Sequence, residues 1–255
     1  MAQAKLLTPR PTSVTEGVYF REDFIGNGTI TTNLVGQNMW TITASGNGGT
    51  ATYGVTVTDY ESPFGGLRHL TDGTATNDGN AFTMLAASAL FPASELGGGF
   101  AFTARVPTLA GNTLTGNSFY IGMHTSVTEA APTDGICIQS VAGVLTLRAD
   151  SVDGSDATQA FANGTTLTSG TTMVIDVPHQ FEVHWTGENG NGGPRYVEAF
   201  CDGEPVAALT TDIDNDEAAT AAIMHYVSAG NDTLELDVWN FEYWQFMDYP
   251  LAPAV

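Results

Sequence analysis

Residues 181–209 read FEVHWTGENGNGGPRYVEAFCDGEPVAAL, and this stretch decides the fold class. Phe181, Val183 and Trp185 alternate with polar side chains, which is the period of a strand that buries one face. The segment GENGNGGP then interrupts regular structure, and a second strand runs from Tyr196 to an Asp-Gly pair. Both central residues of a type I′ hairpin turn need positive φ, which Asp and Gly tolerate. The stretch therefore predicts antiparallel β-sheet with a tight hairpin.

The rest of the chain alternates β-rich runs with turns and shows no long helical pattern. Two alanine-rich stretches, 85–96 and 216–224, are expected to hold a helical turn or two. The glycine-rich ELGGG at 95–99 is expected to be a turn at a sheet edge. About fourteen short strands are typical of an all-β, two-sheet antiparallel jelly-roll sandwich. The predicted strands are 18–24, 38–44, 50–59, 80–86, 99–106, 117–124, 135–140, 143–149, 172–177, 179–186, 195–202, 204–209, 222–228 and 233–246.

The first 17 residues, MAQAKLLTPRPTSVTEG, show neither a strand nor a helix period. Proline fixes φ and removes a backbone donor, which favours extended geometry. We predict an extended N-terminal arm at 1–17, followed by a single sandwich domain at 18–255. The arm is a candidate latch on a neighbouring subunit, and a floppy terminus is the alternative. Its candidate partner-binding residues are Leu6, Leu7, Pro9, Arg10 and Pro11.

Composition limits the classes of partner. The chain has 255 residues, of which 42% are hydrophobic, so it can bury the core of one large sandwich. Its 28 acidic and 7 basic residues give a formal net charge of -21. The basic residues are scattered singly, which argues against binding to nucleic acid or to anionic membranes. The first ten residues lack the apolar core of a signal peptide, and no run approaches the ~20 apolar residues of a membrane helix. We therefore expect synthesis in a cytoplasm.

The cysteines and histidines are predicted to be structural. Cys137 and Cys201 lie in apolar strand contexts, where a free cysteine behaves as a small hydrophobe. A disulfide between them is the less favoured alternative, given cytoplasmic synthesis. The five histidines include no i, i+4 pair of the kind found on a zinc-binding helix. They are expected to be ordinary sheet residues, with His184 facing away from Trp185: His69, His124, His179, His184 and His225.

A series of motifs spread over most of the chain resembles, in order, the concanavalin A-like, laminin G-type jelly rolls of tailed-phage virion proteins. In that family an Asp-Gly turn joins two late strands, as in residues 181–209. The other motifs are FREDFIG at 20–26 followed by Trp40, GGLRHLTDG at 65–73, FAFTARV at 100–106, FYIGM at 119–123 and LELDVWNFEYWQF at 234–246. The resemblance implies the two-sheet fold more strongly than any activity.

The run ELDVWN at 235–240 is the strongest catalytic candidate, because family 16 glycoside hydrolases of this fold carry Glu-x-Asp-x-x-Glu on a strand. Retaining hydrolysis needs two carboxyl groups, one to attack and one to donate a proton. The last position here is Asn240, whose amide cannot be the acid, and Glu242 is the one nearby replacement. We therefore expect no enzymatic activity and interpret the run as an edge or rim strand with outward-pointing acids.

The acidic run DIDNDE at 212–217 is a calcium candidate. An EF-hand loop needs glycine at its sixth position, which here is Glu217, so the run is not an EF-hand. An acidic surface turn is the expected structure, and Asp72 and Asp78 raise the same question more weakly. We predict no cofactor and no metal site.

The resemblance implies a non-enzymatic virion structural protein, made in the host cytoplasm, that decorates or cements a phage capsid. Its expected partners are the major capsid protein or other virion proteins, and it is expected to form a homo-oligomer such as a trimer. Two alternatives remain: a glycan-binding module of a phage fibre or tail, and, less favoured, a jelly-roll glycosidase. Exposed aromatic rings would support glycan binding, but core burial is expected for most of them. These aromatic residues are Trp40, Trp185, Trp239, Trp244, Tyr53, Tyr60, Tyr196, Tyr226 and Tyr243.

Overall fold

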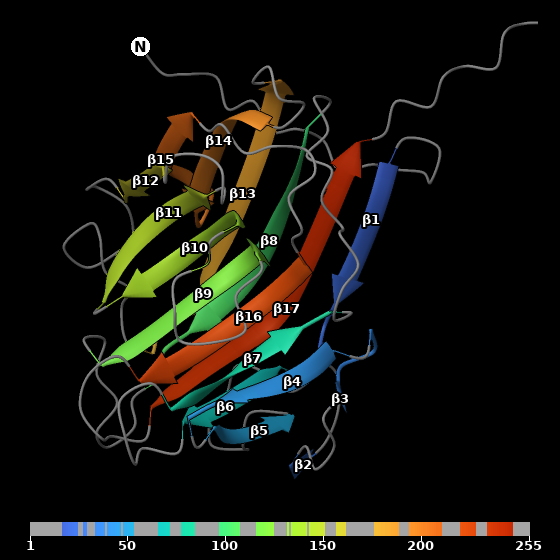
Figure 1. Cartoon of the computed structure of the whole chain (residues 1–255), viewed down its shortest axis with the longest axis vertical. Helices are drawn as coiled ribbons and strands as arrows, with labels where there is room; N and C mark the ends of the chain where they lie inside the picture. Colours follow the sequence, from blue (N-terminus) through green and yellow to red (C-terminus); the bar gives the residue numbers. More distant parts are fainter. Residues whose placement is uncertain are drawn as a thin grey trace, which may run out of the picture.

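The computed structural model describes most strands of the chain and some of the turns between them. The described residues are 17–24, 28–29, 34–38, 40–46, 48–53, 66–71, 78–84, 97–107, 116–124, 132, 134–141, 143–150, 157–161, 176–188, 194–210, 220–227 and 234–246. They form seventeen strands and no helix (Figure 1). In this part of the chain, accordingly, no helix is long and apolar enough to cross a membrane.

The strands form two antiparallel sheets that pack face to face (Figure 1). One sheet has nine strands. Eight of them follow one another in a continuous order, and the ninth, β1 (Gly17–Glu22), pairs with β17 (Glu235–Phe246) outside that order. The order of the eight is β15 (Glu204–Thr210), β14 (Pro194–Cys201), β13 (His179–Glu188), β8 (Gly98–Arg105), β17, β6 (Leu67–Thr71), β5 (Gly49–Tyr53) and β2 (Gly28–Thr29).

The second sheet has eight strands, and four of the seven neighbouring pairs in it are consecutive in sequence. Its order is β12 (Ala157–Ala160), β11 (Val144–Asp150), β10 (Gly135–Val141), β9 (Asn117–His124), β16 (Thr220–Val227), β7 (Gly79–Thr83), β4 (Trp40–Ser45) and β3 (Leu34–Val35). Two stacked antiparallel sheets between which the chain passes repeatedly form a jelly-roll sandwich. The predicted fold class is confirmed.

The decisive hairpin folds as its sequence predicts. Asp202 and Gly203 connect β14 to β15 with φ angles of 51° and 82°, as a type I′ turn requires. Cys201 pairs with Glu204 across this two-residue turn. The Asp202 N–H also donates to the carbonyl of Gln180 on the neighbouring strand, at 2.8 Å. The turn is therefore anchored to β13 as well as to its own hairpin.

Aromatic side chains from both sheets fill the space between them. Phe102 stacks on Phe181 with ring centroids 5.0 Å apart, and Trp40 of the opposite sheet meets Phe241 edge-on at 5.5 Å. Offset and edge-to-face pairs of this kind add to the free energy gained by burying the rings. Core burial is confirmed for Trp40, Trp185, Trp244, Tyr226 and Tyr243, whereas Tyr196 is exposed and Trp239 is partly buried.

Two expected local structures are wrong. The helical turn expected within 216–224 is wrong at its described residues 220–224, which belong to β16 between β9 and β7, whereas the strand predicted at 222–228 is confirmed up to Val227. Hydrogen bonds to two neighbouring strands override the helix propensity of Ala221 and Ala222. The strand expected at 172–177 is also wrong at its described end, because Asp176 occupies a turn with φ 67°. Strands that the prediction left out are β2, β3, β6 and β12.

The glycines expected to form an edge turn instead begin a central strand. Gly98 and Gly99 lie in β8, between β13 and β17. A Cβ atom on Gly98 would lie 2.8 Å from the indole of Trp185, and one on Gly99 would lie 2.4 Å from that of Trp244. Glycine is needed at both positions because the two indole rings lie against the β8 backbone.

Several predictions fall outside the described residues. These are the arm at 1–16 with its candidate contacts Leu6, Leu7, Pro9, Arg10 and Pro11, the alanine-rich stretch 85–96, and residues 54–59 of an expected strand. Residue 17, the last of the predicted arm, already pairs with Phe246 in the nine-stranded sheet.

Candidate functional site

The acidic run ELDVWN lies at the centre of the nine-stranded sheet. β17 pairs with β8 along one side and with β6 and β1 along the other. Glu235, Asp237 and Glu242 are all buried, and Asp237 is only 1% exposed. The expectation of an edge or rim strand is therefore wrong, because neighbouring strands flank β17 on both sides and its acids are buried.

Asp237 is held by two arginines from the flanking strands. Arg68 of β6 donates to both of its carboxylate oxygens, at 2.7 and 3.0 Å. Arg105 of β8 donates to Oδ2 at 2.7 and 3.1 Å, and Arg68 also forms an ion pair with Glu235. Charge-assisted hydrogen bonds are shorter and stronger than those between neutral groups. The Asp237 carboxylate therefore connects β17 to both of its neighbours, β6 and β8.

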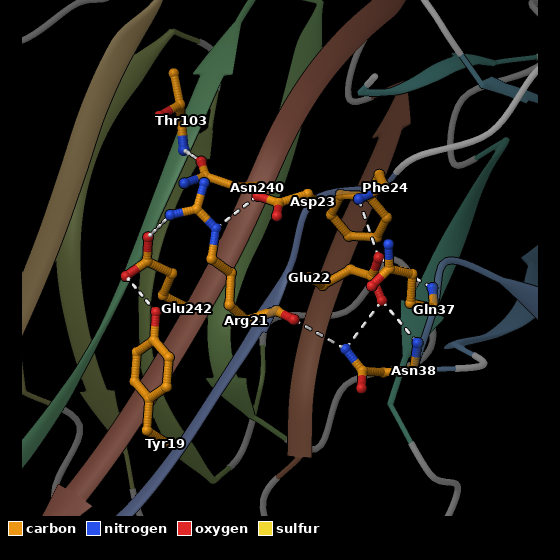
Figure 2. A network of polar contacts seen from close by, with 10 residues as sticks. All are labelled: Tyr19, Arg21, Glu22, Asp23, Phe24, Gln37, Asn38, Thr103, Asn240 and Glu242. Carbon is orange, nitrogen blue, oxygen red and sulfur yellow. Dashed lines mark hydrogen bonds and ion pairs between the residues drawn. The ribbon is translucent and has the colours of Figure 1, made fainter. Parts of the chain in front are cut away.

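Asn240 has a structural role that accounts for the amide in the motif. The pairing of β17 with β8 shifts register between Val238 and Asn240, so Trp239 is the extra residue of a β-bulge. The side-chain oxygen of Asn240 accepts the backbone N–H of Thr103 at 2.9 Å (Figure 2). It thus satisfies a strand donor beside the irregular pairing. The guanidinium carbon of Arg105 lies over the Trp239 ring, 5.3 Å from the ring centroid.

A second polar cluster lies where β1 runs beside β17 (Figure 2). Arg21 donates to Asp23 at 2.6 Å and to Glu242 at 2.9 Å, and the Tyr19 hydroxyl donates to Glu242 at 3.3 Å. The hydrogen bond to Asp23 raises the pKa of the Arg21 guanidinium above its ordinary value. Tyr19 is 44% exposed, and the Arg21 side chain is 47% exposed. The cluster therefore presents an aromatic ring beside fixed polar groups, an arrangement that suits a hydroxyl-rich ligand.

Glu22 joins the two sheets from within. Its carboxylate accepts the backbone N–H groups of Phe24 and Gln37, each at 3.0 Å, and the backbone and side-chain N–H groups of Asn38, at 2.8 and 3.0 Å (Figure 2). β1 belongs to the nine-stranded sheet, whereas Gln37 and Asn38 lie in the turn between β3 and β4 of the other sheet. Gly36 completes this turn at φ 76°, and a Cβ there would lie 2.6 Å from the Glu22 carboxyl carbon. No sequence pattern singled out Glu22.

Replacing Glu22 with glutamine is expected to lower the free energy of unfolding by about 2–4 kcal/mol. The amide keeps one acceptor oxygen but turns an NH₂ group toward two of the four N–H donors, which leaves buried donors unsatisfied. Urea unfolding of the two proteins measures the difference. Glu198→Gln on β14 is the matched control, since Glu198 is exposed and its replacement should change little. Equal, small effects of both substitutions would contradict the proposed role of Glu22.

Two buried histidines meet between the sheets. His69 of β6 and His225 of β16 lie with their Nδ1 atoms 2.7 Å apart, so one ring donates and the other accepts. Burial lowers the pKa of His69 to about 3, and burial with the neighbouring His69 holds the pKa of His225 well below its ordinary range. Burial also lowers the pKa of His124 to about 4. All five histidines lie in strands, as predicted, and His184 faces away from Trp185.

A third cluster forms at the β14–β15 turn. The Nδ1 atom of His179 lies 2.8 Å from Oδ2 of Asp202, and Sγ of Cys201 lies 3.9 Å from the former and 3.8 Å from the latter. Both cysteines are free and buried, as predicted, and the less favoured disulfide between them is not formed.

The other sequence candidates have different outcomes. Residues 212–217 and Asp72 lie outside the described part of the chain. Asp78 is buried, and its carbonyl accepts the N–H of Val227 at 3.0 Å. It is thus a strand-flanking residue of the eight-stranded sheet and not part of a surface turn.

Comparison with known proteins shows the fold. No protein-family model matches the chain, and no curated protein matches it. Among solved structures, a protein of unknown function from Shewanella oneidensis MR-1, SO2946, has a TM-score of 0.58 at 12% identity, over 99% of this chain and 100% of that one. The carbohydrate recognition domain of Emp47p has a TM-score of 0.52 at 11% identity, over 93% of this chain and 100% of that one. The binding domain of botulinum neurotoxin DC, solved with rat synaptotagmin II, has a TM-score of 0.51 at 10% identity, over 89% of this chain and 49% of that one. The chain thus shares a jelly-roll sandwich with lectin-like domains.

Proposed function

We propose that this protein is a non-enzymatic virion structural protein that decorates or cements a phage capsid through protein–protein contacts. The observation that carries the non-enzymatic part is the pairing of the β17 carboxylates with arginines. Asp237 is engaged by Arg68 and Arg105, and Glu242 by Arg21. These groups stabilise a sheet and offer no proton donor opposite a nucleophile.

Surface properties support the decoration role. The net charge of -21 disfavours contact with packaged nucleic acid and keeps free subunits apart. Apolar surface is nevertheless available for a protein contact, because Val141 and Val144 flank the β10–β11 turn with exposed side chains. The predicted N-terminal arm would supply a second, extended contact.

Cosedimentation with heads of the encoding phage that lack this protein tests the proposal. The full chain is expected to pellet with heads at a fixed, saturable stoichiometry. Removal of residues 1–16, which stops short of β1, is expected to abolish pelleting without lowering the melting temperature. A truncated chain that still coats the heads would contradict the latch. A full chain that stays in the supernatant would contradict the decoration role.

Glycan binding is the second candidate, and the cluster of Tyr19, Arg21, Asp23 and Glu242 favours it. An exposed aromatic ring beside fixed donors and acceptors suits the mixed apolar and polar faces of a sugar. The carbohydrate recognition domain of Emp47p also shares this fold. A glycan array run on the same sample is the test: a hit that disappears in Tyr19→Ala, together with no binding to heads, would transfer the function to host recognition.

A further inference from the structure

We propose that His179, Cys201 and Asp202 form a binding site for Zn²⁺ at the β14–β15 turn. The three side chains supply one nitrogen, one sulfur and one oxygen atom, all within 4.8 Å of one another. Imidazole, thiolate and carboxylate are the ligand types that zinc accepts in proteins, whereas calcium and magnesium prefer oxygen alone. The site is independent of the capsid role proposed above.

The dimensions of the triangle fit a zinc ion. Its sides are 2.8 Å from nitrogen to oxygen, 3.9 Å from nitrogen to sulfur and 3.8 Å from oxygen to sulfur. The point equidistant from the three atoms therefore lies about 2 Å from each of them, close to the roughly 2.0–2.3 Å of Zn–N, Zn–O and Zn–S bonds. Small shifts of the three side chains would bring the ligand atoms to these bond lengths.

The backbone fixes the ligands before any ion arrives. Cys201 of β14 pairs with Phe181 of β13. His179 precedes Phe181 by two residues on β13, so its side chain lies on the same face of the sheet as that of Cys201. Asp202 occupies the first position of the type I′ turn, and its Oδ1 accepts the N–H of Gln180 at 2.9 Å. This bond directs Oδ2 toward the histidine. A ligand set held by strand pairing and a second hydrogen bond loses little entropy on binding.

The site lies at the boundary between the core and the surface. His179 and Cys201 are fully buried, so two of the three ligands are shielded from competing solvent. Cysteine binds zinc as the thiolate, so binding of Zn²⁺ releases the thiol proton to solvent. The Asp202 side chain is 28% exposed, which gives the ion a route in from solvent.

Titration of the full chain with Co²⁺ tests the site, because a cobalt–thiolate bond produces a charge-transfer absorption band in the near ultraviolet. The band is expected to saturate at one equivalent and to vanish when Zn²⁺ is added. Cys201→Ser should abolish it. Cys137→Ser, which removes the other buried thiol, should leave it unchanged. A band that survives in Cys201→Ser, or no band in the native chain, would overturn the proposal.

Asp202→Asn separates the metal site from the turn. Asparagine also tolerates positive φ, and Asn-Gly is a favoured type I′ pair, so the hairpin should persist. The amide oxygen can still accept from Gln180, but the charged ligand is lost. We expect an unchanged melting temperature without metal and Zn²⁺ affinity weakened about tenfold or more. Excess Zn²⁺ should raise the melting temperature of the native chain, and excess Ca²⁺ should not. Equal Zn²⁺ affinity of both proteins would mean that the cluster is only a hydrogen-bonded turn.

Discussion

Replacing Asp237 with alanine is expected to lower the free energy of unfolding by about 3–5 kcal/mol. The substitution removes the carboxylate that Arg68 and Arg105 share, and both guanidinium groups lie largely out of solvent. Removing one partner of a buried ion cluster leaves charge that water cannot solvate. Urea unfolding followed by tryptophan fluorescence measures the loss, since Trp239 lies against Arg105.

Two further variants identify the cause of that loss. Asp23→Ala breaks an ion pair with Arg21 in which both side chains are well exposed, and it should cost no more than about 1 kcal/mol. Asp237→Leu combined with Arg105→Met removes both charges, and it should recover much of the stability lost in Asp237→Ala. If Asp237→Ala behaved like Asp23→Ala, the cluster would be solvated and its carboxylate would again be a candidate for chemistry.

The sequence predicts those parts of the fold that depend on local pattern. Alternation in residues 181–186 identifies β13, and the Asp-Gly pair identifies the β14–β15 turn with its positive φ angles. Both signals act over a few residues, so they do not depend on the rest of the chain. The helical turn expected within 216–224 does not form at residues 220–224, because the helix propensity of the alanines is weaker than the hydrogen bonds offered by β9 and β7, and the strand predicted at 222–228 forms instead.

The site was less predictable because its contacts join distant parts of the chain. The Arg68–Asp237 pair spans 169 residues, and the His69–His225 contact spans 156. Whether β17 lies at the edge or the centre of its sheet depends on which strands pair with it, and no property of ELDVWN specifies this. The sequence motif places Asn240 where a glycosidase has its catalytic acid. In the structure, its side-chain oxygen accepts the backbone N–H of Thr103 beside the β-bulge. Glu22 was missed for the same reason, because three of its four donors come from Gln37 and Asn38 in a turn of the opposite sheet.

Acidification from pH 7 to pH 5 is expected to destabilise the protein by about 6 kcal/mol, or about 2 kcal/mol for each of three buried histidines. His69, His124 and His225 have pKa values lowered by burial, to about 3 and about 4 for the first two. In the unfolded chain each titrates near 6.5. Below that pH the unfolded state binds protons that the folded state excludes, so stability falls as the pH falls toward the folded pKa values.

Two of the three histidines lie in contact with each other between the two sheets, so the loss of stability on acidification acts on the packing of the sandwich. His69 and His225 come from opposite sheets and share one N–H···N bond, so a proton entering the pair places a charge between the two layers. Urea unfolding at half-unit pH steps should show an uptake of nearly three protons on unfolding near pH 5. His124→Gln should reduce the uptake by one proton, and His69→Leu combined with His225→Leu should reduce it by two. Stability that stays constant between pH 7 and pH 5 would show that these rings are already charged or solvated in the folded protein, contrary to their burial.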